Sequence, residues 1–477
     1  MSTLYDPLRL SAVSLDVLTV GRATPAAVAA RQRVRLTAVL DTARRGSRFY
    51  RQHWHAVDEA DLRAAAHPLA LLPVVTRHEL MANFDDWVTD LRLKLADLQA
   101  YTANPAHIAE PYQGRYMVWE SSGTSGQPGI FVQDVQAMTA YDALEALRRC
   151  TPRSLVRWMD PLCLGERIAL ITAVGGHFAS HVSAQRLRQI NPWVAHTIQT
   201  FSIMQPVGEL VAALNAWNPT VIATYPTVAA LLAEQATQGH LRIRPREMWV
   251  GGETLTPVMR EQVEHTLGCT LRNNYGASEF LTMGWECSHG HLHLNADWVV
   301  LEPVDEHHRP VPPGQPSYTT LLTHLANTVQ PLIRYDLGDQ LTLHSERCDC
   351  GSPLPVMEVQ GRRDQPLVLS GVYGAPVTLL PMALTTVLED EAGVYDFQLR
   401  QHDARTLVLR LPQGGAAGQA AMTRCRTALN TFAAEQGALP ITLLEEVGQA
   451  LPRGRSGKVC RVVAAAPAAH CQPNRLM

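Results

Sequence analysis

Apolar side chains in the first hundred residues recur at helical spacing. In the segment RQRVRLTAVLDTARR, residues 31–45, the apolar positions Val34, Leu36, Val39 and Leu40 fall close to one stripe of a helix. Such a stripe is the face that a surface helix buries against its neighbours. The pattern therefore predicts a helical N-terminal region.

The pattern changes near Arg115, where short apolar runs flank a polar loop. YMVW at 116–119 and GIFV at 129–132 indicate two strands, and a helix over 135–150 follows them. Further strand-like runs then alternate with helical ones, at 167–174, 220–225, 246–252 and 269–276. This alternation predicts a layered α/β domain in which helices pack on a mostly parallel sheet.

Two later changes of pattern indicate where domains end. From Leu292 to about Val359 the sequence is richer in strand-like runs, and after GRRD at 361–364 a small α/β pattern begins. The Ala/Pro-rich tail at 464–477 is typical of a frayed chain end. We therefore expect a large N-terminal domain at 1–360 and a small C-terminal α/β domain at 361–477.

The composition fits a packed globular protein of 477 residues. Hydrophobic residues make up 46% and charged residues 18%, and the formal net charge of −3 gives no electrostatic case for binding nucleic acid or a membrane surface. No run of eighteen apolar residues occurs, and the N-terminal MSTLYDPLRL lacks the basic segment and apolar core of a signal peptide. The sequence thus predicts a soluble cytoplasmic protein in which most of the nine cysteines are reduced core residues.

A Gly/Ser-rich loop, ESSGTSGQPGIF, occupies Glu120–Phe131 between the first two expected strands. Taken alone, it fits a flexible hairpin turn as well as a phosphate site, in which backbone N–H groups and hydroxyls converge on an anion. It differs from the GxxxxGK(S/T) phosphate loop because no helix begins directly after it and it contains no lysine. A phosphate site of another class needs support from other residues.

Two later motifs could supply that support. NNYGASEF at 273–280 ends an expected strand with Tyr275, which suits base stacking, and Glu279, whose oxygens suit Mg²⁺. YDLGD at 335–339 places the carboxylate of Asp339 on a turn, where it suits the two hydroxyls of a ribose. Each motif by itself is more typical of an ordinary strand end or turn.

Lysine is unusually rare in this chain. Of its 41 Lys and Arg residues, only Lys94 and Lys458 are lysines. Lys458 lies in LPRGRSGKVCR at 451–461, a Gly/Ser-rich segment that by itself is typical of a solvated basic loop. A lysine in a chain that otherwise uses arginine indicates that a compact ammonium charge is needed there.

The motifs SSGTSGQPG, GGE, NNYGASE, YDLGD, GRRD and PRGRSGK follow one another in this order. Their order and spacing resemble the AMP-forming adenylating (acyl-CoA synthetase) superfamily, and within it the phenylacetate-CoA ligase family of aryl-CoA ligases. The segments at 42–54 and 71–80 also resemble that family, so the resemblance covers most of the chain. Each motif alone is a weak signal, whereas six in order are a strong one.

The resemblance implies a role for each motif. One group of residues would hold the phosphates, adenine and ribose of ATP, and Glu279 beside it would bind Mg²⁺. The group consists of Ser121, Ser122, Gly123, Thr124, Ser125, Gly126, Gly252, Glu253, Asn274, Tyr275, Gly276, Ser278, Asp339 and Arg362. Lys458 would bridge the substrate carboxylate and the α-phosphate, and Asp364 would be the hinge on which the small domain rotates as a lid.

The implied reaction activates an aryl or arylacetic acid in two steps. The carboxylate attacks the α-phosphorus of ATP, which releases pyrophosphate and forms an acyl-adenylate, and a thiol then displaces AMP. Lys458 and Mg²⁺ would offset the negative charge that develops at phosphorus. No carrier domain follows the expected lid, so we expect the thiol to be coenzyme A, with a separate acyl carrier protein as the alternative.

By the same resemblance, the acyl pocket lies after the expected strand at 167–174. It would be lined by His177, Phe178, Tyr225, Gly276 and Ala277. The aromatic side chains suit an aromatic acid, while His177 either bonds to a ring substituent or is satisfied by backbone groups. The sequence does not separate benzoate-like, anthranilate-like and phenylacetate-like acids.

Two Cys/His segments, CSHGHLH at 287–293 and CDCG at 348–351, have no part in this reaction. Each segment alone fits reduced cysteines and a histidine-rich surface loop, whereas together they offer the ligands of a Cys₃His structural zinc site. Some members of the resembled family bind zinc with such an arrangement. This chain matches it with Cys287, His293, Cys348 and Cys350, and His289 is the alternative fourth ligand.

A third hypothesis is a binding protein that keeps the fold without catalysis. The presence of Glu279, Asp339, Arg362 and Lys458 together argues against it.

Many relatives carry lysine where this chain has Gln127, which predicts a weaker hold on pyrophosphate. The resemblance also allows a homodimer.

Overall fold

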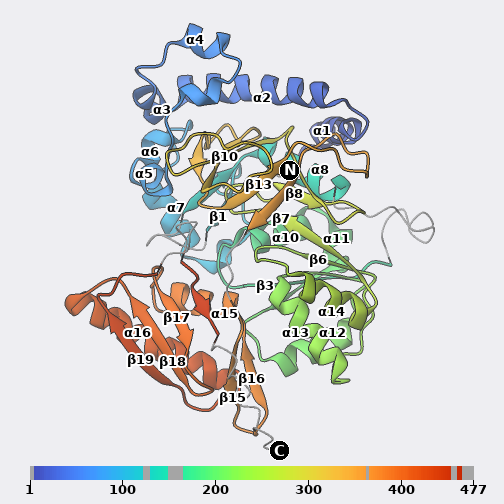
Figure 1. Cartoon of the computed structure of the whole chain (residues 1–477), viewed down its shortest axis with the longest axis vertical. Coiled ribbons are helices and arrows are strands. Elements are labelled where there is room, and N and C mark those ends of the chain that lie inside the picture. Colours follow the sequence, from blue (N-terminus) through green and yellow to red (C-terminus); the bar gives the residue numbers. More distant parts are fainter. Residues whose placement is uncertain (1–4, 122–128, 149–164, 361–364, 453–458, 465–477) are drawn as a thin grey trace, which may run out of the picture. The chain divides into compact units, whose positions relative to one another are not determined.

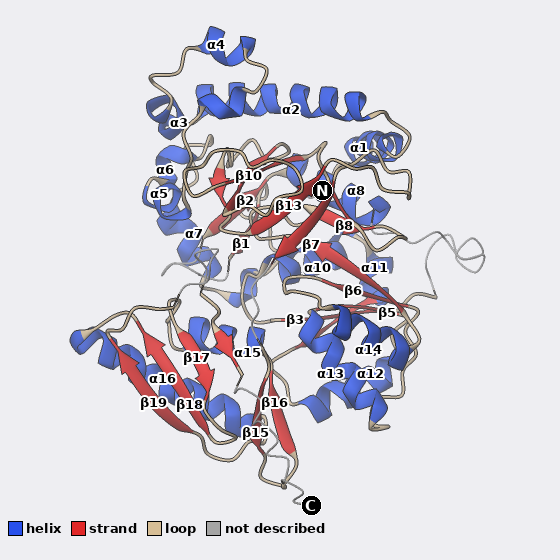
Figure 2. Ribbon diagram, viewed as in Figure 1, coloured by secondary structure: helices blue, strands red, loops and turns tan. Residues whose placement is uncertain are grey.

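The computed structural model describes residues 5–121, 129–148, 165–360, 365–452 and 459–464. These residues fall into two compact units, which divide after residue 360 (Figure 1). Both units combine helices with strands (Figure 2), so the predicted α/β class is confirmed.

Helices form the first hundred residues of the larger unit, as predicted. They are α1 (Pro7–Val20), α2 (Pro25–Gly46), α3 (Arg48–His53), α4 (Glu59–Ala64), η1 (Pro68–Leu71), α5 (Arg77–Ala82), α6 (Phe84–Trp87), α7 (Leu95–Thr102) and η2 (Pro105–His107). α2 begins where it does because the Thr24 side chain accepts a hydrogen bond from Ala27 N and Pro25 takes the first helical position. The predicted stripe is buried except at Val34, whose side chain is exposed.

A sheet of nine strands lies at the centre of the larger unit, in the order β13-β14-β9-β8-β7-β6-β5-β3-β4. Five of its strands are parallel: β3 (Ile168–Thr172), β4 (Ile198–Ser202), β5 (Val221–Thr224), β6 (Glu247–Val250) and β7 (Thr270–Tyr275). The others are antiparallel: β8 (Gly284–Glu286), β9 (Leu292–Leu294), β13 (Gln340–His344) and β14 (Val356–Gln360). The predicted parallel sheet is therefore correct for one half, where helices join the strands.

Helices connect the parallel strands, as the alternating sequence pattern predicts. They are α10 (Ala179–Ile190), α11 (Pro192–Thr197), α12 (Val207–Trp217), α13 (Pro226–Thr237) and α14 (Pro257–Leu267). α14 shows why such a helix ends: Gly268 follows its last residue in the left-handed conformation, with φ of 63°.

Smaller elements complete the larger unit. They are the hairpin of β1 (Met117–Glu120) and β2 (Ile130–Gln133), helix α8 (Val135–Arg148), and a sheet of β10 (Val299–Val304), β11 (Thr319–His324) and β12 (Tyr335–Asp336). The hairpin confirms the two strands predicted around the Gly/Ser-rich loop. The predicted helix is confirmed as far as Arg148, and its last two residues lie outside the described ones.

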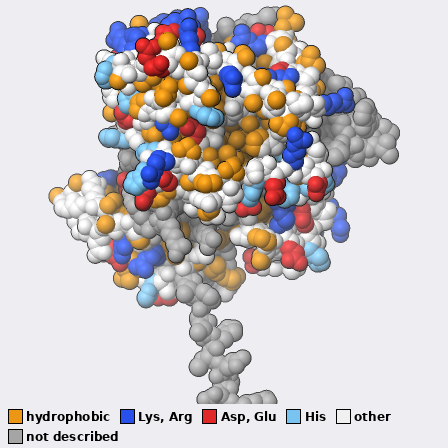
Figure 3. Space-filling view, turned by 45° about the horizontal axis from the view of Figure 1, so that its top comes forward, with side chains coloured by type: hydrophobic (Ala, Val, Ile, Leu, Met, Phe, Trp, Pro, Cys, Tyr) orange, Lys and Arg blue, Asp and Glu red, His pale blue; other side chains and the backbone are white. Residues whose placement is uncertain are grey.

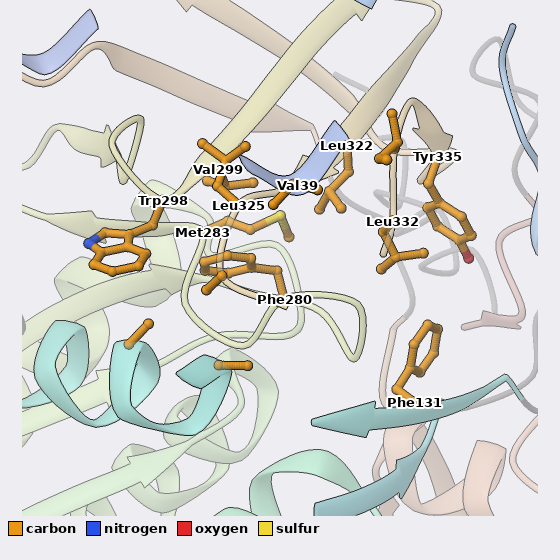
Figure 4. Close-up of a cluster of buried hydrophobic side chains, with 14 of the residues drawn as sticks. Val39, Phe131, Phe280, Met283, Trp298, Val299, Leu322, Leu325, Leu332 and Tyr335 are labelled. Carbon is orange, nitrogen blue, oxygen red and sulfur yellow. The ribbon is translucent and has the colours of Figure 1, made fainter. Parts of the chain in front are cut away.

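A buried apolar cluster includes Phe280, the residue after Glu279 (Figure 4). The ring of Phe280 is fully buried, with its centroid 4.5 Å from that of His324 and 5.2 Å from that of Tyr141. Tyr335 lies at one end of the same cluster with its hydroxyl directed away from it. Removal of these rings from water fixes the backbone directly after Glu279.

The smaller unit has its own sheet, in the order β19-β18-β17-β20. Its elements are β15 (Leu367–Ser370), β16 (Pro376–Leu379), α15 (Pro381–Thr386), the π-helical turn η3 (Val387–Glu391), β17 (Gln398–Gln401), β18 (Thr406–Leu411), α16 (Gly415–Glu435), β19 (Thr442–Val447) and β20 (Val462–Val463). A buried ion pair joins Arg461 Nη1 to Glu389 Oε1 at 2.5 Å. The predicted frayed tail lies outside the described residues, apart from Ala464.

Charges of both signs are interspersed on the face of the molecule in Figure 3. On the face in Figure 3, basic and acidic side chains alternate around a central group of hydrophobic ones. This mixture agrees with the net charge of −3 and forms no extended basic face there. Among the described residues, no helix is both long enough and apolar enough to cross a membrane.

Candidate active site

Most of the predicted ATP and acyl residues that the structure describes lie after the carboxyl ends of parallel strands. Phe178 follows β3, Tyr225 directly follows β5, Gly252 and Glu253 follow β6, and Gly276 directly follows β7. These four strands are neighbours in the sheet order, so their carboxyl ends share one edge. Ligands of open α/β sheets characteristically bind at this edge.

The GGE motif makes a close backbone approach at this edge. Gly252 has φ of 80°, and a Cβ built on it would lie 3.2 Å from two ring atoms of Tyr225. A Cβ on Gly251 would lie 2.9 Å from the carbonyl oxygen of Asn274. Glycine at both positions therefore lets the turn after β6 pack between its two neighbours.

Glu253 is bonded to the start of α13. Its Oε2 accepts hydrogen bonds from Thr227 N at 3.0 Å and from Thr227 Oγ1 at 2.7 Å. A carboxylate at a helix N-terminus is favoured by the otherwise unpaired N–H groups there. Glu253, predicted to border the adenine, is thus held by the start of the helix after β5. Tyr225 directly precedes that helix, and its hydroxyl lies 2.9 Å from Thr172 Oγ1.

Two residues predicted to bind different parts of the nucleotide are joined directly. The Tyr275 hydroxyl donates a hydrogen bond to Asp339 Oδ2 at 2.8 Å, across 64 positions of the sequence. Burial and the charge of Glu279 raise the pKa of Tyr275, so the hydroxyl stays protonated. The expected base-stacking ring and the expected ribose carboxylate therefore form one unit at the end of β7.

Glu279 is held by two side chains that the sequence did not single out. Arg77 Nη2 donates to Glu279 Oε1 at 3.1 Å, and the Tyr335 hydroxyl donates to the same oxygen at 2.7 Å. Arg77 Nε also donates to the Tyr335 hydroxyl at 3.2 Å. Burial acts to lower the pKa of Arg77. Its partners Tyr335 and Glu279 outweigh that effect and raise the pKa, so the guanidinium remains charged.

The backbone explains how Arg77 reaches a site 202 positions away. Val75 N donates to Arg334 O at 3.1 Å, and Asp336 N donates to Val75 O at 2.9 Å. The segment before α5 therefore pairs with β12, and this pairing sets Arg77 beside Tyr335. Sequence spacing does not predict this pairing, because the two paired segments lie far apart in the chain and local periodicity reports only on neighbouring residues.

The Gly/Ser-rich loop is anchored at its base. Ser121 N donates to Gly129 O at 2.8 Å, and Gly129 N donates to Ser121 Oγ at 2.9 Å. Trp119 Nε1 donates to Ser278 O at 2.8 Å, which places the loop's base next to the Glu279 segment. Ser122, Gly123, Thr124, Ser125 and Gly126 lie outside the described residues, as do Arg362, Asp364 and Lys458.

The acyl-pocket segment adjoins the same base. Glu120 N donates to His177 O at 2.8 Å, and the ring of Tyr101 lies 5.4 Å from that of His177. Burial lowers the pKa of His177, and the backbone carbonyls of residues 102 and 107 offset this only in part, so the imidazole is neutral near pH 7. Burial also raises the pKa of the Glu120 carboxyl.

The turn after β7 is so tight that only glycine fits at position 276. A Cβ built there would lie 1.9 Å from the carbonyl oxygen of Leu281. Ala277 N donates to Phe280 O at 2.9 Å, and Phe280 N donates to Ala277 O at 3.1 Å, which closes the turn. This turn presents Ser278 and Glu279.

The three cysteines and the histidine predicted as zinc ligands lie together. Their ligand atoms are all within 4.8 Å of one another, although the two segments are about sixty residues apart: Cys287, His293, Cys348 and Cys350. The pairing of β14 with β9 brings the segments together. His289 is exposed and is not part of this cluster.

The surroundings of the cluster suit a metal. His293 Nδ1 lies 2.9 Å from Leu354 O, a bond that directs the proton to Nδ1 and leaves Nε2 facing Cys350 Sγ at 3.3 Å. Backbone N–H groups of Cys350 and Ser352 point at the sulfurs of Cys348 and Cys350, at 3.5 and 3.4 Å. Three thiols and one oriented imidazole are a donor set that Zn²⁺ commonly takes.

Comparison with known proteins identifies relatives in sequence and in fold. Phenylacetate-coenzyme A ligase of Thermus thermophilus is 30% identical over 191 residues, which are 37% of this chain and 42% of that protein. Protein CapK of Staphylococcus aureus is 29% identical over 135 residues, 28% of each chain. The chain thus spans less than half the length of either curated relative. No family model matches the sequence.

A solved structure extends the likeness to nearly the whole chain. The crystal structure of 2-hydroxyisobutyryl-CoA ligase in complex with 2-HIB-AMP and CoA matches with a TM-score of 0.57 and 21% sequence identity, covering 93% of this chain and 91% of that one. At this identity the match establishes a shared fold. The partial sequence similarity to a phenylacetate-coenzyme A ligase and the fold shared with 2-hydroxyisobutyryl-CoA ligase both agree with the order of the motifs.

Proposed function

We propose that this protein is an AMP-forming acid–thiol ligase that converts an aryl or arylacetic acid to its coenzyme A thioester. The convergence of the joined Tyr275 and Asp339, the buried Glu279 and the base of the Gly/Ser-rich loop at one edge of the sheet carries this proposal. An anchored loop, a carboxylate and a hydroxyl beside an aromatic ring are the parts a nucleotide site needs. The names of the sequence relative and of the structural neighbour support the same reaction class.

In this proposal, the large unit binds ATP and the acid, and residues 361–477 form the lid. Tyr275 and Gly252 border the adenine, while Asp339 and Arg362 hold the ribose. Ser121 and the loop after it hold the β- and γ-phosphates. A carboxylate oxygen then forms a bond to the α-phosphorus as the bond to pyrophosphate breaks.

Glu279 would hold Mg²⁺ through Oε2, since both of its hydrogen bonds from Arg77 and Tyr335 go to Oε1. Bound there, the ion would supply positive charge next to the phosphates. Lys458 would supply the second charge, between the acid and the α-phosphate, and Asp364 would serve as the hinge of the lid.

An aromatic acid suits the described part of the acyl segment. Phe178, Tyr225 and Tyr101 offer aromatic faces, and the neutral His177 adds no charge. The acyl carbon would then be attacked by a thiol sulfur, with AMP leaving and the thiol proton passing to solvent or base. Coenzyme A is the proposed thiol, because both named ligases are CoA ligases.

The proposal has three further parts. Cys287, His293, Cys348 and Cys350 would hold a structural Zn²⁺ that joins two loops. The homodimer allowed by the resemblance is checked by light scattering on the purified chain. A cytoplasmic location, where ATP and CoA are available, belongs to the same proposal.

Acid-dependent exchange of labelled pyrophosphate into ATP tests the first half-reaction. We expect exchange with at least one acid of an aromatic panel. Lys458→Ala should reduce it by about 10²–10³-fold, the usual effect of losing a preorganised charge. Lys94→Ala is the matched control, because Lys94 is the other lysine and pairs with Asp85 at the surface.

The outcomes separate the hypotheses. No exchange with aromatic or aliphatic acids would overturn the ligase proposal in favour of a binding protein. Exchange without thioester formation from free CoA would favour the carrier protein as acceptor. Equal loss in both lysine variants would show that the effect is not specific to Lys458.

A further inference from the structure

Three side chains, among them the proposed metal ligand Glu279, form a closed set of hydrogen bonds. Arg77 Nη2 donates to Glu279 Oε1 at 3.1 Å, the Tyr335 hydroxyl donates to the same oxygen at 2.7 Å, and Arg77 Nε donates to the Tyr335 hydroxyl at 3.2 Å. A carboxylate oxygen has two lone pairs, so these two donors use the hydrogen-bonding capacity of Oε1. Among the described residues none donates to Oε2, which is therefore the oxygen left for a cation.

The Tyr335 hydroxyl has one direction in which it can donate. Its oxygen accepts a hydrogen bond from Arg77 Nε, and its single hydrogen is directed at Glu279 Oε1. The ring is 2% exposed and lies in the apolar cluster, with the hydroxyl directed away from that cluster (Figure 4). Close packing of the ring therefore keeps the hydroxyl from turning to another acceptor.

The residue before Tyr335 has an unusual backbone conformation. Arg334 has φ of 50°, in the left-handed region that residues other than glycine rarely adopt. Its N donates to Thr323 Oγ1 at 3.0 Å, its carbonyl oxygen accepts from Val75 N at 3.1 Å, and its buried side chain pairs with Glu302 at 3.4 Å. Residues held in such conformations by their surroundings cluster at functional sites. The contacts of Arg334 fix the backbone from which Tyr335 extends toward the metal ligand.

We propose that Tyr335 and Arg77 are positioning residues that set how strongly the nucleotide site depends on Mg²⁺. By holding Oε1, they fix the rotation of the Glu279 carboxylate, so that Oε2 keeps one orientation. A free carboxylate rotates over a broad range about its last side-chain bond, and a metal that binds it must first stop this rotation. The inference rests on the proposed function, because that proposal assigns Mg²⁺ to Glu279.

A purely structural role is the alternative, and the chain contains a matched arrangement to test it. The Tyr116 hydroxyl donates to Asp90 Oδ2 at 2.6 Å, and Arg92 Nη2 donates to the same oxygen. This second set again joins a tyrosine, a carboxylate and an arginine, but it contains none of the predicted nucleotide, acyl or zinc residues. Tyr116→Phe is therefore the matched control for Tyr335→Phe, since each change removes one hydroxyl bond to a carboxylate oxygen.

Isothermal titration calorimetry of ATP binding to the full chain, in Mg²⁺ and in EDTA, tests the inference without turnover. We expect Mg²⁺ to tighten ATP binding to the wild type by about tenfold or more. Tyr335→Phe should weaken binding about tenfold in Mg²⁺, the usual effect of removing a side chain that orients a metal ligand, and should leave the Kd in EDTA unchanged. Arg77→Lys keeps the charge but cannot make both bonds of the guanidinium, so it should act in the same direction. Tyr116→Phe should leave the response to Mg²⁺ unchanged.

The outcomes separate this inference from the ligase proposal. No ATP binding by the wild type in either buffer would overturn the proposed function, and this inference with it. Binding that does not respond to Mg²⁺, or a response that is unchanged in Tyr335→Phe and Arg77→Lys, would overturn the positioning role.

The positioning role is equally overturned if Tyr335→Phe weakens binding in EDTA as much as in Mg²⁺, or if Tyr116→Phe has the same effect. In both cases the loss would reflect general destabilisation. Circular dichroism checks that each variant folds, and Arg77→Lys decides the question if Tyr335→Phe does not fold.

Discussion

The contact of Arg77 with Glu279 predicts a large loss of stability when the arginine is replaced by methionine. The two side chains are 16% and 5% exposed, so the pair is largely buried. Removing one partner of a buried ion pair typically costs about 3–5 kcal/mol, because the other charge stays in a medium that solvates it poorly. Tyr335 would still donate to the carboxylate, so we expect the lower end of that range for Arg77→Met, about 3 kcal/mol.

Tryptophan fluorescence during urea unfolding is a suitable assay. All nine tryptophans lie at or before Trp298, so the signal reports on the larger unit. Arg63→Met is the matched control, because the pair of Arg63 with Glu59 has a similarly short distance of 2.5 Å but side chains 61% and 51% exposed. An exposed pair contributes about 0–1 kcal/mol.

A double variant separates the pair from its surroundings. Tyr335→Phe alone removes a hydrogen bond to a charged oxygen, which costs about 1.5–3 kcal/mol. Because Arg77, Tyr335 and Glu279 contact one another, the effects of Arg77→Met and Tyr335→Phe should not add. The reasoning from this buried network is wrong if the free energy of unfolding of Arg77→Met lies within about 1 kcal/mol of the wild type. It is also wrong if the effects of the two substitutions add.

Three further predictions concern the Cys/His cluster, the buried His324 and the tight turn at Gly276. Cys350→Ser should abolish zinc that copurifies with the chain, measured by plasma mass spectrometry, whereas Cys269→Ser should not, since Cys269 lies outside the cluster. Burial lowers the pKa of His324 to about 3, so its neutral form stabilises the fold at neutral pH and this stability is lost as the pH falls below about 6.5. Between pH 7 and 5 the wild type should lose about 2 kcal/mol more than His324→Gln in urea unfolding, and equal slopes would contradict this. Gly276→Ala should cost more than about 3 kcal/mol because its Cβ meets a backbone oxygen, whereas Gly208→Ala, with open space around it, should change stability by less than about 1 kcal/mol; similar melting temperatures would refute the steric argument.

Much of the fold was predictable because local periodicity encodes it. The alternating runs from residue 167 onward predicted parallel strands with helices between them, and β3, β5, β6 and β7 fall within those runs. The antiparallel half of the sheet was less predictable. Strands such as β8 and β9 are three residues long, too short for a clear alternation, and only their neighbours decide their pairing.

The candidate site was likewise predictable only in part from the sequence. Tyr275, Asp339 and Glu279 could be named from their motifs, because each motif places a reactive side chain at a strand end. Their mutual contacts could not be named, because spacing does not show that the Tyr275 hydroxyl meets Asp339. The resemblance of the segment 71–80 gave no role to Arg77, since the pairing of the preceding segment with β12 places this side chain beside Glu279.

The sequence by itself determined the order of the motifs, the α/β class and the three cysteines of the Cys/His cluster. These follow from residue type and spacing, which the chain carries locally. Only the tertiary structure decided that His293 and not His289 joins the cluster, and that Arg77 and Tyr335 hold Glu279. Each of these depends on which distant segments pack together, and that choice is made by burial of the whole core rather than by any one stretch of sequence.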